Sequence, residues 1–258
     1  MSEAEDAVDM RIKGRAVSAD LIRYERCFAP LLATPPSQIT LNMVLTLYGH
    51  AISTCTRRVG MVLMEKNVPF KFVAMDYTKA EHKTPEYLKK QPFGQVPYLD
   101  DDGFIVYESR AICRYICDKY PDQGTPLVPT ELKAKALFEQ ACSIEASNFD
   151  PFAYGAFMEM YKLKMGVIHN KDRMNELLAT LEKKLEGYEA ILSKQKYLAG
   201  DEVSLADLFH IPYGSTLPQC GYNGLESGEK LNVVRWWKDI SSRESWQTVK
   251  DGLKGTIE

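Results

Sequence analysis

The stretch "GHAISTCTRRVG" (residues 49–60) places Ser53 and Cys55 two residues apart, where a strand pattern changes to a helix pattern. A thiolate is a nucleophile and a helix N-terminus stabilises negative charge, so Cys55 is one candidate for chemistry. Ser53 is the other, because its hydroxyl can donate a hydrogen bond to the thiolate of a bound ligand. A redox centre at a strand-to-helix junction would carry its nucleophilic cysteine at the position of Ser53, often within a Cys-x-x-Cys motif. The sequence contains no Cys-x-x-Cys motif. We therefore predict that Cys55 is a small buried side chain, and the role of Ser53 depends on the rest of the chain.

A second group of residues lies in "PFGQVPYL" (residues 92–99). A cis Val96–Pro97 bond would turn the Val96 backbone N–H and C=O outward, where an extended peptide can pair with them. The alternative is a proline at a sheet edge that only limits strand pairing.

A third group lies in "YESRAI" (residues 107–112), where a strand pattern meets a helix start. The first N–H groups of that helix and the Ser109 hydroxyl form a site for a carboxylate, and Glu108 could bind an amino group beside it. In "EHKTPEYL", His82 and Lys83 precede a short helix, and Lys83 could bind a second carboxylate. The alternatives are that Ser109 is only a helix N-cap and that His82 and Lys83 are solvated surface residues.

The elements that must position these residues are short. Residues 43–48 and 70–75 have strand patterns and flank a helix over residues 54–66, which predicts a βαβ unit with two parallel strands. "VPYL" and "FIVY" flank "DDDG", a hairpin signal, and a helix runs from Ser109 to about Tyr120. This order of elements is that of a thioredoxin-like domain.

After residues 121–131, which are rich in proline and glycine, the patterns are helical only. We predict helices over residues 132–148 and 172–192 and a capping box in "VSLADL", with Ser204 as N-cap and Asp207 at N3. The expected domains are therefore an N-terminal extension (1–42), an α/β thioredoxin-like domain (43–124) and an all-α domain (132–258).

The composition narrows the class of protein. With 45% hydrophobic residues, 26% charged residues and a net charge of -3, the 258-residue chain is typical of a soluble protein without nucleic-acid or membrane partners. The start "MSEAEDAVDM" lacks basic residues, which argues against a targeting peptide and for a cytoplasmic location. The six cysteines have no disulfide framework spacing, and Cys113 and Cys117, one helical turn apart, are expected in the core. The four histidines lack metal-ligand spacing, so no metal site is expected.

Several motifs together resemble the glutathione transferases, and most closely the phi class of plants and fungi. They are "GHAISTCTRRV", "EHKTPEYLKKQPFGQVP", "ESRAICRYI", "FDPFA", "KYLAGDEVSLADLFHIP" and "VVRWWKDISSRESW", in the family's order from Met43 onward. The resemblance implies the cytosolic glutathione transferase fold and a homodimer. It leaves residues 1–42 as extra, without a predicted role.

The resemblance also implies roles for residues. Ser53 would activate the glutathione thiol, and Arg57 would support its helix. The remaining glutathione contacts would be His82, Lys83, Gln95, Val96, Pro97, Glu108 and Ser109. The electrophile pocket would be lined by Ile52, Phe149, Phe152 and Phe157.

The implied function is conjugation of the glutathione thiolate to apolar electrophiles, a detoxification activity, accompanied by reduction of organic hydroperoxides. One alternative is a non-catalytic ligand-binding protein on the same fold. Another is a thiol-exchange reductase that uses Cys55.

Overall fold

A mixed sheet forms the base of the structure, which is a computed structural model describing residues 44–257. Its strands are β1 (Leu45–Gly49), β2 (Phe70–Ala74), β3 (Tyr98–Asp101), β4 (Phe104–Tyr107) and β5 (Thr256–Ile257). The order is β4-β3-β1-β2-β5, and β1 pairs in parallel with β2, as the βαβ prediction requires. The two-residue β5 was not predicted; it pairs antiparallel with β2. The predicted extension, residues 1–42, lies outside the described residues.

The predicted hairpin is present between β3 and β4, which pair antiparallel. Asp102 and Gly103 form its two-residue turn with φ values of 52° and 89°. Positive φ at both positions is the signature of a type I′ turn, whose twist matches that of paired strands.

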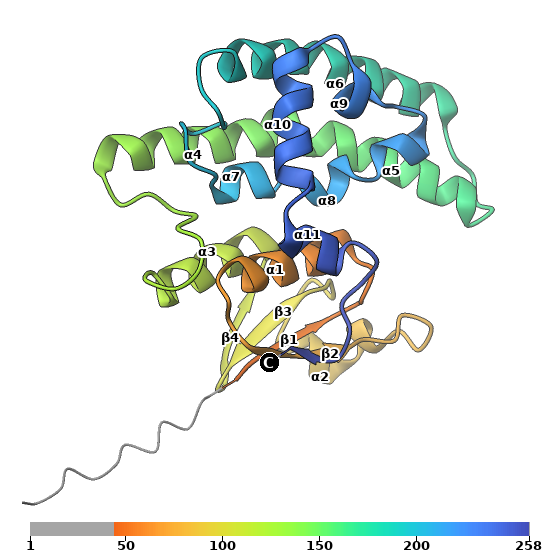
Figure 1. The fold of residues 1–258 in the computed structure, drawn as a ribbon. Coiled ribbons are helices and arrows are strands. Elements are labelled where there is room, and N and C mark those ends of the chain that lie inside the picture. The colour runs from red at the N-terminus through yellow and green to blue at the C-terminus, as the bar shows by residue number, and fades with distance from the viewer. Residues whose placement is uncertain (1–43, 258) are drawn as a thin grey trace, which may run out of the picture. The chain divides into compact units, whose positions relative to one another are not determined.

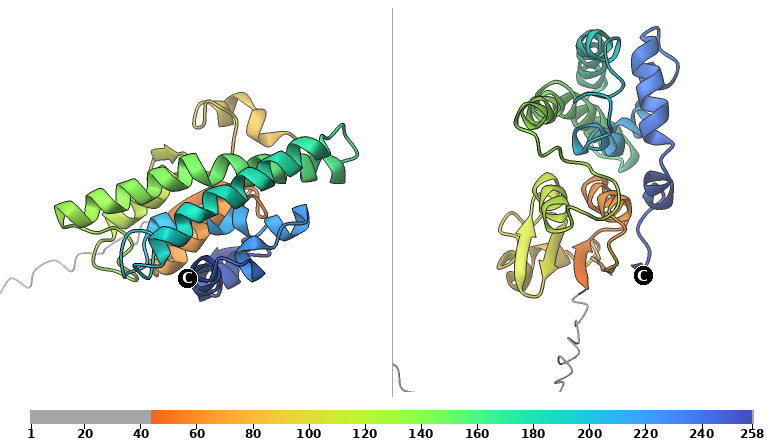
Figure 2. Two further views of the ribbon diagram at one scale, coloured as in Figure 1. Left: turned by 90° about the horizontal axis from the view of Figure 1, so that it is seen from above. Right: turned by 60° about the vertical axis from the view of Figure 1, so that its left-hand side comes forward.

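Two helices, α1 (Thr54–Glu65) and α3 (Ser109–Lys119), cover one face of the sheet, and the short α2 (Pro85–Leu88) lies on the other side (Figure 1). The predicted apolar face of α1 is buried, with Val59, Val62 and Leu63 each 0% exposed. Arg58 and Glu65 on the same helix are buried as well. A helix pattern with charges on its other faces suggests an exposed surface, but α1 lies between the sheet and further helices, so both faces are covered (Figure 2).

The rest of the described chain is helical apart from β5. Its helices are α4 (Leu132–Asn148), α5 (Asp150–Lys164), α6 (Lys171–Leu192), α7 (Leu205–Leu208), α8 (Ile211–Gly214), α9 (Gly224–Ser227), α10 (Leu231–Ser241) and α11 (Glu244–Val249). Two 3₁₀ turns, η1 (Glu81–Lys83) and η2 (Leu217–Cys220), complete the elements. The predicted fold class, a thioredoxin-like domain followed by an all-α part, is confirmed. None of the described helices combines the length and apolarity needed to cross a membrane.

The capping box predicted at the start of α7 is present and buried. Asp207 accepts hydrogen bonds from the Ser204 N–H and hydroxyl, both at 2.9 Å. It also accepts from the Leu198 N–H and from Nε1 of Trp236, again at 2.9 Å. One carboxylate thereby joins α7, α10 and the preceding loop.

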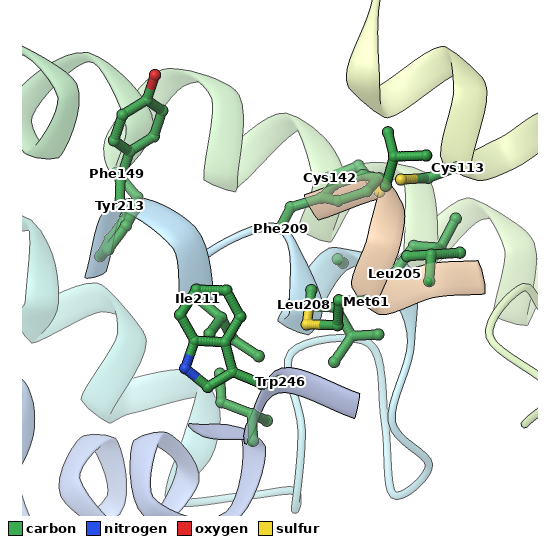
Figure 3. Packing of buried hydrophobic residues seen from close by; sticks show 14 of the residues in the cluster. Met61, Cys113, Cys142, Phe149, Leu205, Leu208, Phe209, Ile211, Tyr213 and Trp246 are labelled. Atoms are coloured by element: carbon green, nitrogen blue, oxygen red, sulfur yellow. The ribbon is translucent and has the colours of Figure 1, made fainter. Parts of the chain in front are cut away.

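One core connects the sheet part with the helical part. Figure 3 shows Met61 of α1 and Cys113 of α3 beside Leu205 and Leu208 of α7, with Trp246 of α11 nearby. The predicted burial of Cys113 and Cys117 is confirmed. Because α1 packs against α3, α8 and α11, elements from distant parts of the described chain fix its position.

Candidate active site

Ser53 is the N-cap of α1, which begins at Thr54 as predicted. Its Oγ accepts a hydrogen bond from the Thr56 N–H at a long 3.5 Å. In that bond the hydroxyl is the acceptor, so its own hydrogen remains available for another group. The backbone N–H groups of the first turn point the same way, which makes this end of α1 a place for negative charge.

The segment before β3 brings a peptide backbone to the same end of the sheet. The Val96–Pro97 bond is cis, the first of the two alternatives that the sequence left open. Tyr87 donates a hydrogen bond to the Gln95 carbonyl at 2.6 Å, and Gln91 accepts from the Gln95 N–H at 3.2 Å. Among the described residues, neither the N–H nor the C=O of Val96 has a hydrogen-bond partner. Both groups are therefore free to pair with an extended ligand.

The start of α3 contributes the third element. Glu108 is its N-cap with a φ of 69°, an uncommon value for a residue with a side chain. Within the part of the chain that the structure describes, no acceptor meets the N–H groups of Ser109, Arg110 and Ala111. Ser109 itself is 6% exposed, and its hydroxyl accepts a hydrogen bond from Arg58.

A cavity of about 470 Å³ lies between these elements. It is lined by Ser53, Thr54, Cys55, Tyr77, His82, Gly94, Gln95, Val96, Arg110, Asp150, Tyr154 and Tyr213. Four predicted site residues are thus brought together: Ser53, His82, Gln95 and Val96. The predicted residues Lys83, Pro97, Glu108 and Ser109 are not part of this lining.

His82 and Lys83 differ in their surroundings. The His82 ring lies against Tyr77, with ring centroids 4.4 Å apart, and burial followed by the charge of Lys83 lowers the pKa of His82. No partner for its buried Nδ1 is found in the described chain. Lys83 instead donates to the Gly94 carbonyl at 2.7 Å, so its ammonium holds the loop that carries Gln95 and Val96.

The aromatic wall of the cavity differs from the predicted electrophile pocket. Phe149 is 0% exposed and packs on His210, with centroids 4.6 Å apart, so it cannot meet a ligand. Ile52 is 63% exposed and lies outside the lining, as do the half-buried Phe152 and Phe157. The wall is made instead of Tyr77, Tyr154 and Tyr213. Sequence periodicity could not separate Tyr154 from core aromatics, because α5 also carries Phe152, Phe157 and Tyr161.

Cys55 is not the buried side chain that we predicted. It is half-buried, lines the cavity, and its Sγ accepts a hydrogen bond from Nη1 of Arg58 at 3.6 Å. The prediction was wrong because Cys55, at the second position of α1, faces the cavity, whereas the apolar face of the helix lies elsewhere.

Arg57 anchors α1 to the C-terminal segment. It donates to the Lys250 carbonyl at 2.5 Å and lies over the Trp246 ring at 5.3 Å. Burial lowers its pKa. The geometry is that of a support for the helix.

A buried ion network that sequence reasoning missed closes the cavity on the side of the helices. Arg110 binds both oxygens of the fully buried Glu145, at 2.9 and 2.6 Å, and one oxygen of Asp150 at 2.6 Å. Although burial opposes it, these bonds raise the pKa of Arg110. Arg110 and Asp150 stand in the motifs "ESRAI" and "FDPFA", and only the fold brings them together. No group of three or more His, Cys, Asp or Glu residues that could hold a metal is found among residues 44–257.

Comparison with known proteins decides the family. Residues 43–118 match the family model "Glutathione S-transferase, N-terminal domain", and residues 151–244 match "Glutathione S-transferase, C-terminal domain". The chain belongs to the glutathione S-transferase family. Members of this family use glutathione as a substrate, and the chain is an enzyme of the transferase type.

Known relatives align with most of this chain. Glutathione S-transferase hmp2 of Hypomyces subiculosus is 46% identical over 209 residues, which cover 79% of this chain and 96% of hmp2. Glutathione S-transferase F13 of Arabidopsis thaliana is 38% identical over 213 residues, covering 82% of this chain and 97% of that protein. The predicted resemblance to phi-class glutathione S-transferases is confirmed.

Solved structures of glutathione transferases have the same fold. Glutathione transferase F7 of Populus trichocarpa aligns with a TM-score of 0.76 and 38% identity, covering 82% of this chain and all of that one. Glutathione S-transferase I of maize, solved with an atrazine glutathione conjugate, aligns with a TM-score of 0.73 and 33% identity, covering 81% of this chain and 97% of that one.

Proposed function

We propose that this glutathione transferase conjugates the glutathione thiolate to apolar electrophiles and that Ser53 activates the thiol. One observation carries the proposal: the Ser53 hydroxyl, the unpaired Val96 backbone and three tyrosines line one cavity. Val96 would pair with the cysteinyl backbone of glutathione, which places its sulfur near the start of α1. The tyrosines supply apolar ring surface for the second substrate.

The role of Ser53 follows from thiol ionisation. A free thiol with a pKa near 8.5 is roughly 3% ionised at pH 7, and lowering that pKa by about two units makes most of it thiolate, for about 2.7 kcal/mol. A hydrogen bond to a charged group and a helix N-terminus together supply stabilisation of this order. The thiolate then attacks the electrophile, the new C–S bond replaces the bond to the leaving group, and the thiol proton goes to solvent.

Replacing Ser53 with Ala tests this mechanism. The substitution should slow conjugation at pH 7 by about tenfold or more, because one hydrogen bond to a charged group is lost, while glutathione binds nearly as before. The rate should recover as the pH rises, since the pKa of the bound thiol moves upward. A stopped-flow titration of the thiolate absorbance against pH measures that pKa directly.

Asn170→Ala is the matched control. Asn170 is the N-cap of α6, accepts from the Arg173 N–H at 2.9 Å, and is not among the residues that line the cavity. The control loses a helix cap without losing a thiol-directed hydroxyl, so its conjugation rate should stay unchanged. An unaltered rate and thiol pKa in Ser53→Ala would remove Ser53 from the mechanism.

We further propose reduction of organic hydroperoxides by the same bound thiolate. The sulfur attacks the terminal peroxide oxygen, which releases an alcohol and leaves a glutathione sulfenic acid, and a second glutathione converts this to glutathione disulfide and water. A coupled assay with cumene hydroperoxide measures the activity. Tight binding of apolar dyes without turnover in either assay would favour the non-catalytic ligand-binding alternative.

Cys55 favours a second candidate function, thiol exchange. Its sulfur lines the cavity and accepts a hydrogen bond from the Arg58 guanidinium, so a disulfide bound in the cavity would meet it. The thiolate would attack a glutathione mixed disulfide, forming a Cys55–glutathione disulfide and releasing the other thiol; a second glutathione would regenerate Cys55. Mass spectrometry after incubation with glutathione disulfide tests this, and an unmodified Cys55 would rule it out.

We also propose that the protein is a cytoplasmic homodimer active in detoxification, as its family membership implies. Analytical ultracentrifugation of the full chain tests the oligomeric state. A sedimentation coefficient that corresponds to a monomer at micromolar concentration would contradict the dimer.

A further inference from the structure

Arg58 is a charged side chain placed where the helix pattern gives no reason to expect one. It is 0% exposed and among the largest fully buried side chains of the described chain. Burying a guanidinium is costly unless it is paired and hydrogen-bonded. The groups that pair with the Arg58 guanidinium therefore need to be identified.

The carboxylate nearest to Arg58 is committed to another arginine. Asp150 Oδ1 lies 3.7 Å from Nη2 of Arg58 but 2.6 Å from Nη2 of Arg110. Arg110 also holds Glu145 with two bonds. In the part of the chain that the structure describes, Arg58 has no carboxylate at hydrogen-bond distance, and its buried Nε lacks a partner.

The guanidinium points instead toward the two helix starts of the site. Nη1 donates to the Ser109 hydroxyl at 2.8 Å and to the Cys55 sulfur at 3.6 Å, and Nη2 donates to the Phe209 carbonyl at 3.3 Å. Arginine has no acceptor, so Ser109 Oγ must be the acceptor in the shortest of these bonds. The Ser109 hydrogen is consequently free to be donated elsewhere.

Three groups that attract an anion thus meet at the start of α3. They are the hydroxyl of Ser109, the unpaired N–H groups of the first turn, and the positive charge of Arg58 beneath them. This helix has 11 residues, long enough for its terminus to carry a partial positive charge. An anion at this point would lie near a guanidinium whose ion pair with Asp150 is long, at 3.7 Å, and shared with Arg110.

We propose that Arg58 is a positioning residue for glutathione: it orients the Ser109 hydroxyl and supplies the buried charge that binds the α-carboxylate of the γ-glutamyl group. The proposal rests on the proposed function, which makes glutathione the ligand. Arg58 acts through Ser109 and through its field and does not touch the reacting sulfur. Because the carboxylate keeps its charge throughout the reaction, Arg58 stabilises the bound ground state and the transition state equally.

The test compares glutathione with an analogue whose γ-glutamyl α-carboxylate is a neutral amide. Isothermal titration calorimetry on full-length protein gives the Kd of both ligands for wild type, Arg58→Met and Arg58→Lys. In Arg58→Met the Kd for glutathione should rise about tenfold or more, while the Kd for the amide changes less than about threefold. Arg58→Lys keeps the charge but not the planar fork, so its preference for glutathione should be intermediate.

Steady-state kinetics supply a readout that a purely structural role would not give. Loss of uniform binding raises KM for glutathione and leaves kcat within about threefold. Arg243→Met is the matched control: Arg243 is a half-buried arginine that binds Glu65 at 2.6 Å at the other end of α1. The control should lower the unfolding temperature without changing the preference for glutathione over the amide.

The outcomes separate this proposal from the proposed function. Equal losses for both ligands in Arg58→Met and Arg58→Lys, or unchanged Kd values, would overturn the role of Arg58 alone. Wild type that binds glutathione with a preference over the amide but shows no Ser53-dependent turnover would overturn the conjugation mechanism alone. Wild type that binds neither ligand would overturn both.

Discussion

Ser53 and Ser109 show how a small side chain becomes a directed donor. Each lies at the start of a helix, and each Oγ already accepts a hydrogen bond, from the Thr56 N–H and from Arg58 respectively. A hydroxyl with its acceptor role occupied presents its hydrogen outward. The residue type was visible in the sequence, but the direction of each O–H depends on partners that folding supplies.

The cysteines should differ in reactivity. Burial raises the pKa of Cys117 and of Cys142 to about 12, and Cys113 and Cys220 are also buried with raised pKa values. Of these described cysteines and Cys55, N-ethylmaleimide at pH 7 should modify only Cys55 in the folded protein, and glutathione should protect it. Peptide mass spectrometry measures the labelling, with the guanidinium-unfolded chain as control. Equal labelling of Cys117 or Cys142 would contradict the prediction.

His210 should make stability depend on pH. Its ring nitrogens lie 2.8 Å from the Ala206 carbonyl and 3.0 Å from the Tyr188 hydroxyl, and burial lowers its pKa to about 3. Unfolded histidine binds a proton near pH 6.5, so this group has no effect well above that pH. Below it, the unfolding free energy should fall by about 1.4 kcal/mol per pH unit, until the folded pKa is reached.

Urea denaturation of wild type and His210→Gln at pH 7, 6 and 5 isolates this contribution. The variant should be less stable at pH 7, because glutamine fills the site less well. The difference between the two proteins should shrink as the pH falls. Parallel pH profiles would show that His210 does not titrate in this way.

At the scale of elements, α1 joins the sheet to the helical part through buried charge. Glu65 accepts from Arg243 at 2.6 and 2.7 Å, from Ser245 at 2.5 Å and from Thr125 at 2.7 Å. Burial raises the pKa of Glu65, but these hydrogen bonds lower it by more. The pKa of Glu65 therefore lies below its usual value. A single carboxylate therefore ties the end of α1 to the loop before α11.

Glu65→Gln should cost about 2–4 kcal/mol at pH 7, because Arg243 would lose its counter-ion in a largely buried place. Chemical denaturation monitored by tryptophan fluorescence measures the loss. Glu176→Gln serves as control: Glu176 pairs with Arg173 at 3.4 Å on the surface, and its removal should change stability by about 0.5 kcal/mol or less. A comparable loss in both variants would contradict a special role for Glu65.

At the scale of the whole molecule, one continuous core predicts cooperative unfolding of residues 44–257. Buried residues of the sheet, α1, α3 and the later helices belong to one cluster, and the structure groups the described residues into one compact unit. Trp236, Trp237 and Trp246 all lie in α10 and α11, so their fluorescence reports on the helical part. Hydrogen exchange of β1 and β2 peptides reports on the sheet.

Both probes should give the same denaturant midpoint, and Glu65→Gln should lower the two midpoints together. The lining of the cavity comes from α1, the loops around the sheet, α3, α5 and α8. If these elements unfold together, the cavity is lost only when the whole unit unfolds. Two separated transitions would show that the sheet and the helices unfold independently.

Local sequence patterns determined most of the strands, helices and turns of this protein. Period-two and period-3.6 repeats predicted β1 to β4, α1, α3, α4 and α6, and turn chemistry predicted the hairpin at Asp102 and Gly103. The start of α1 after Ser53 and the box of Ser204 and Asp207 were also predicted, because each depends on residues close in sequence. The sequence left a cis bond before Pro97 and a sheet-edge proline as alternatives, and the structure has the cis bond.

Long-range packing decided the rest. Whether Arg58 and Glu65 are buried, whether Cys55 faces core or cavity, and which aromatic residues form the cavity wall depend on elements that meet only in the folded chain. Phe149 and Tyr213 carry similar sequence signals and both belong to the buried cluster drawn in Figure 3, yet only Tyr213 also lines the cavity. The physical reason is that burial and electrostatics are set by neighbours in space, whereas periodicity reports only on neighbours along the chain.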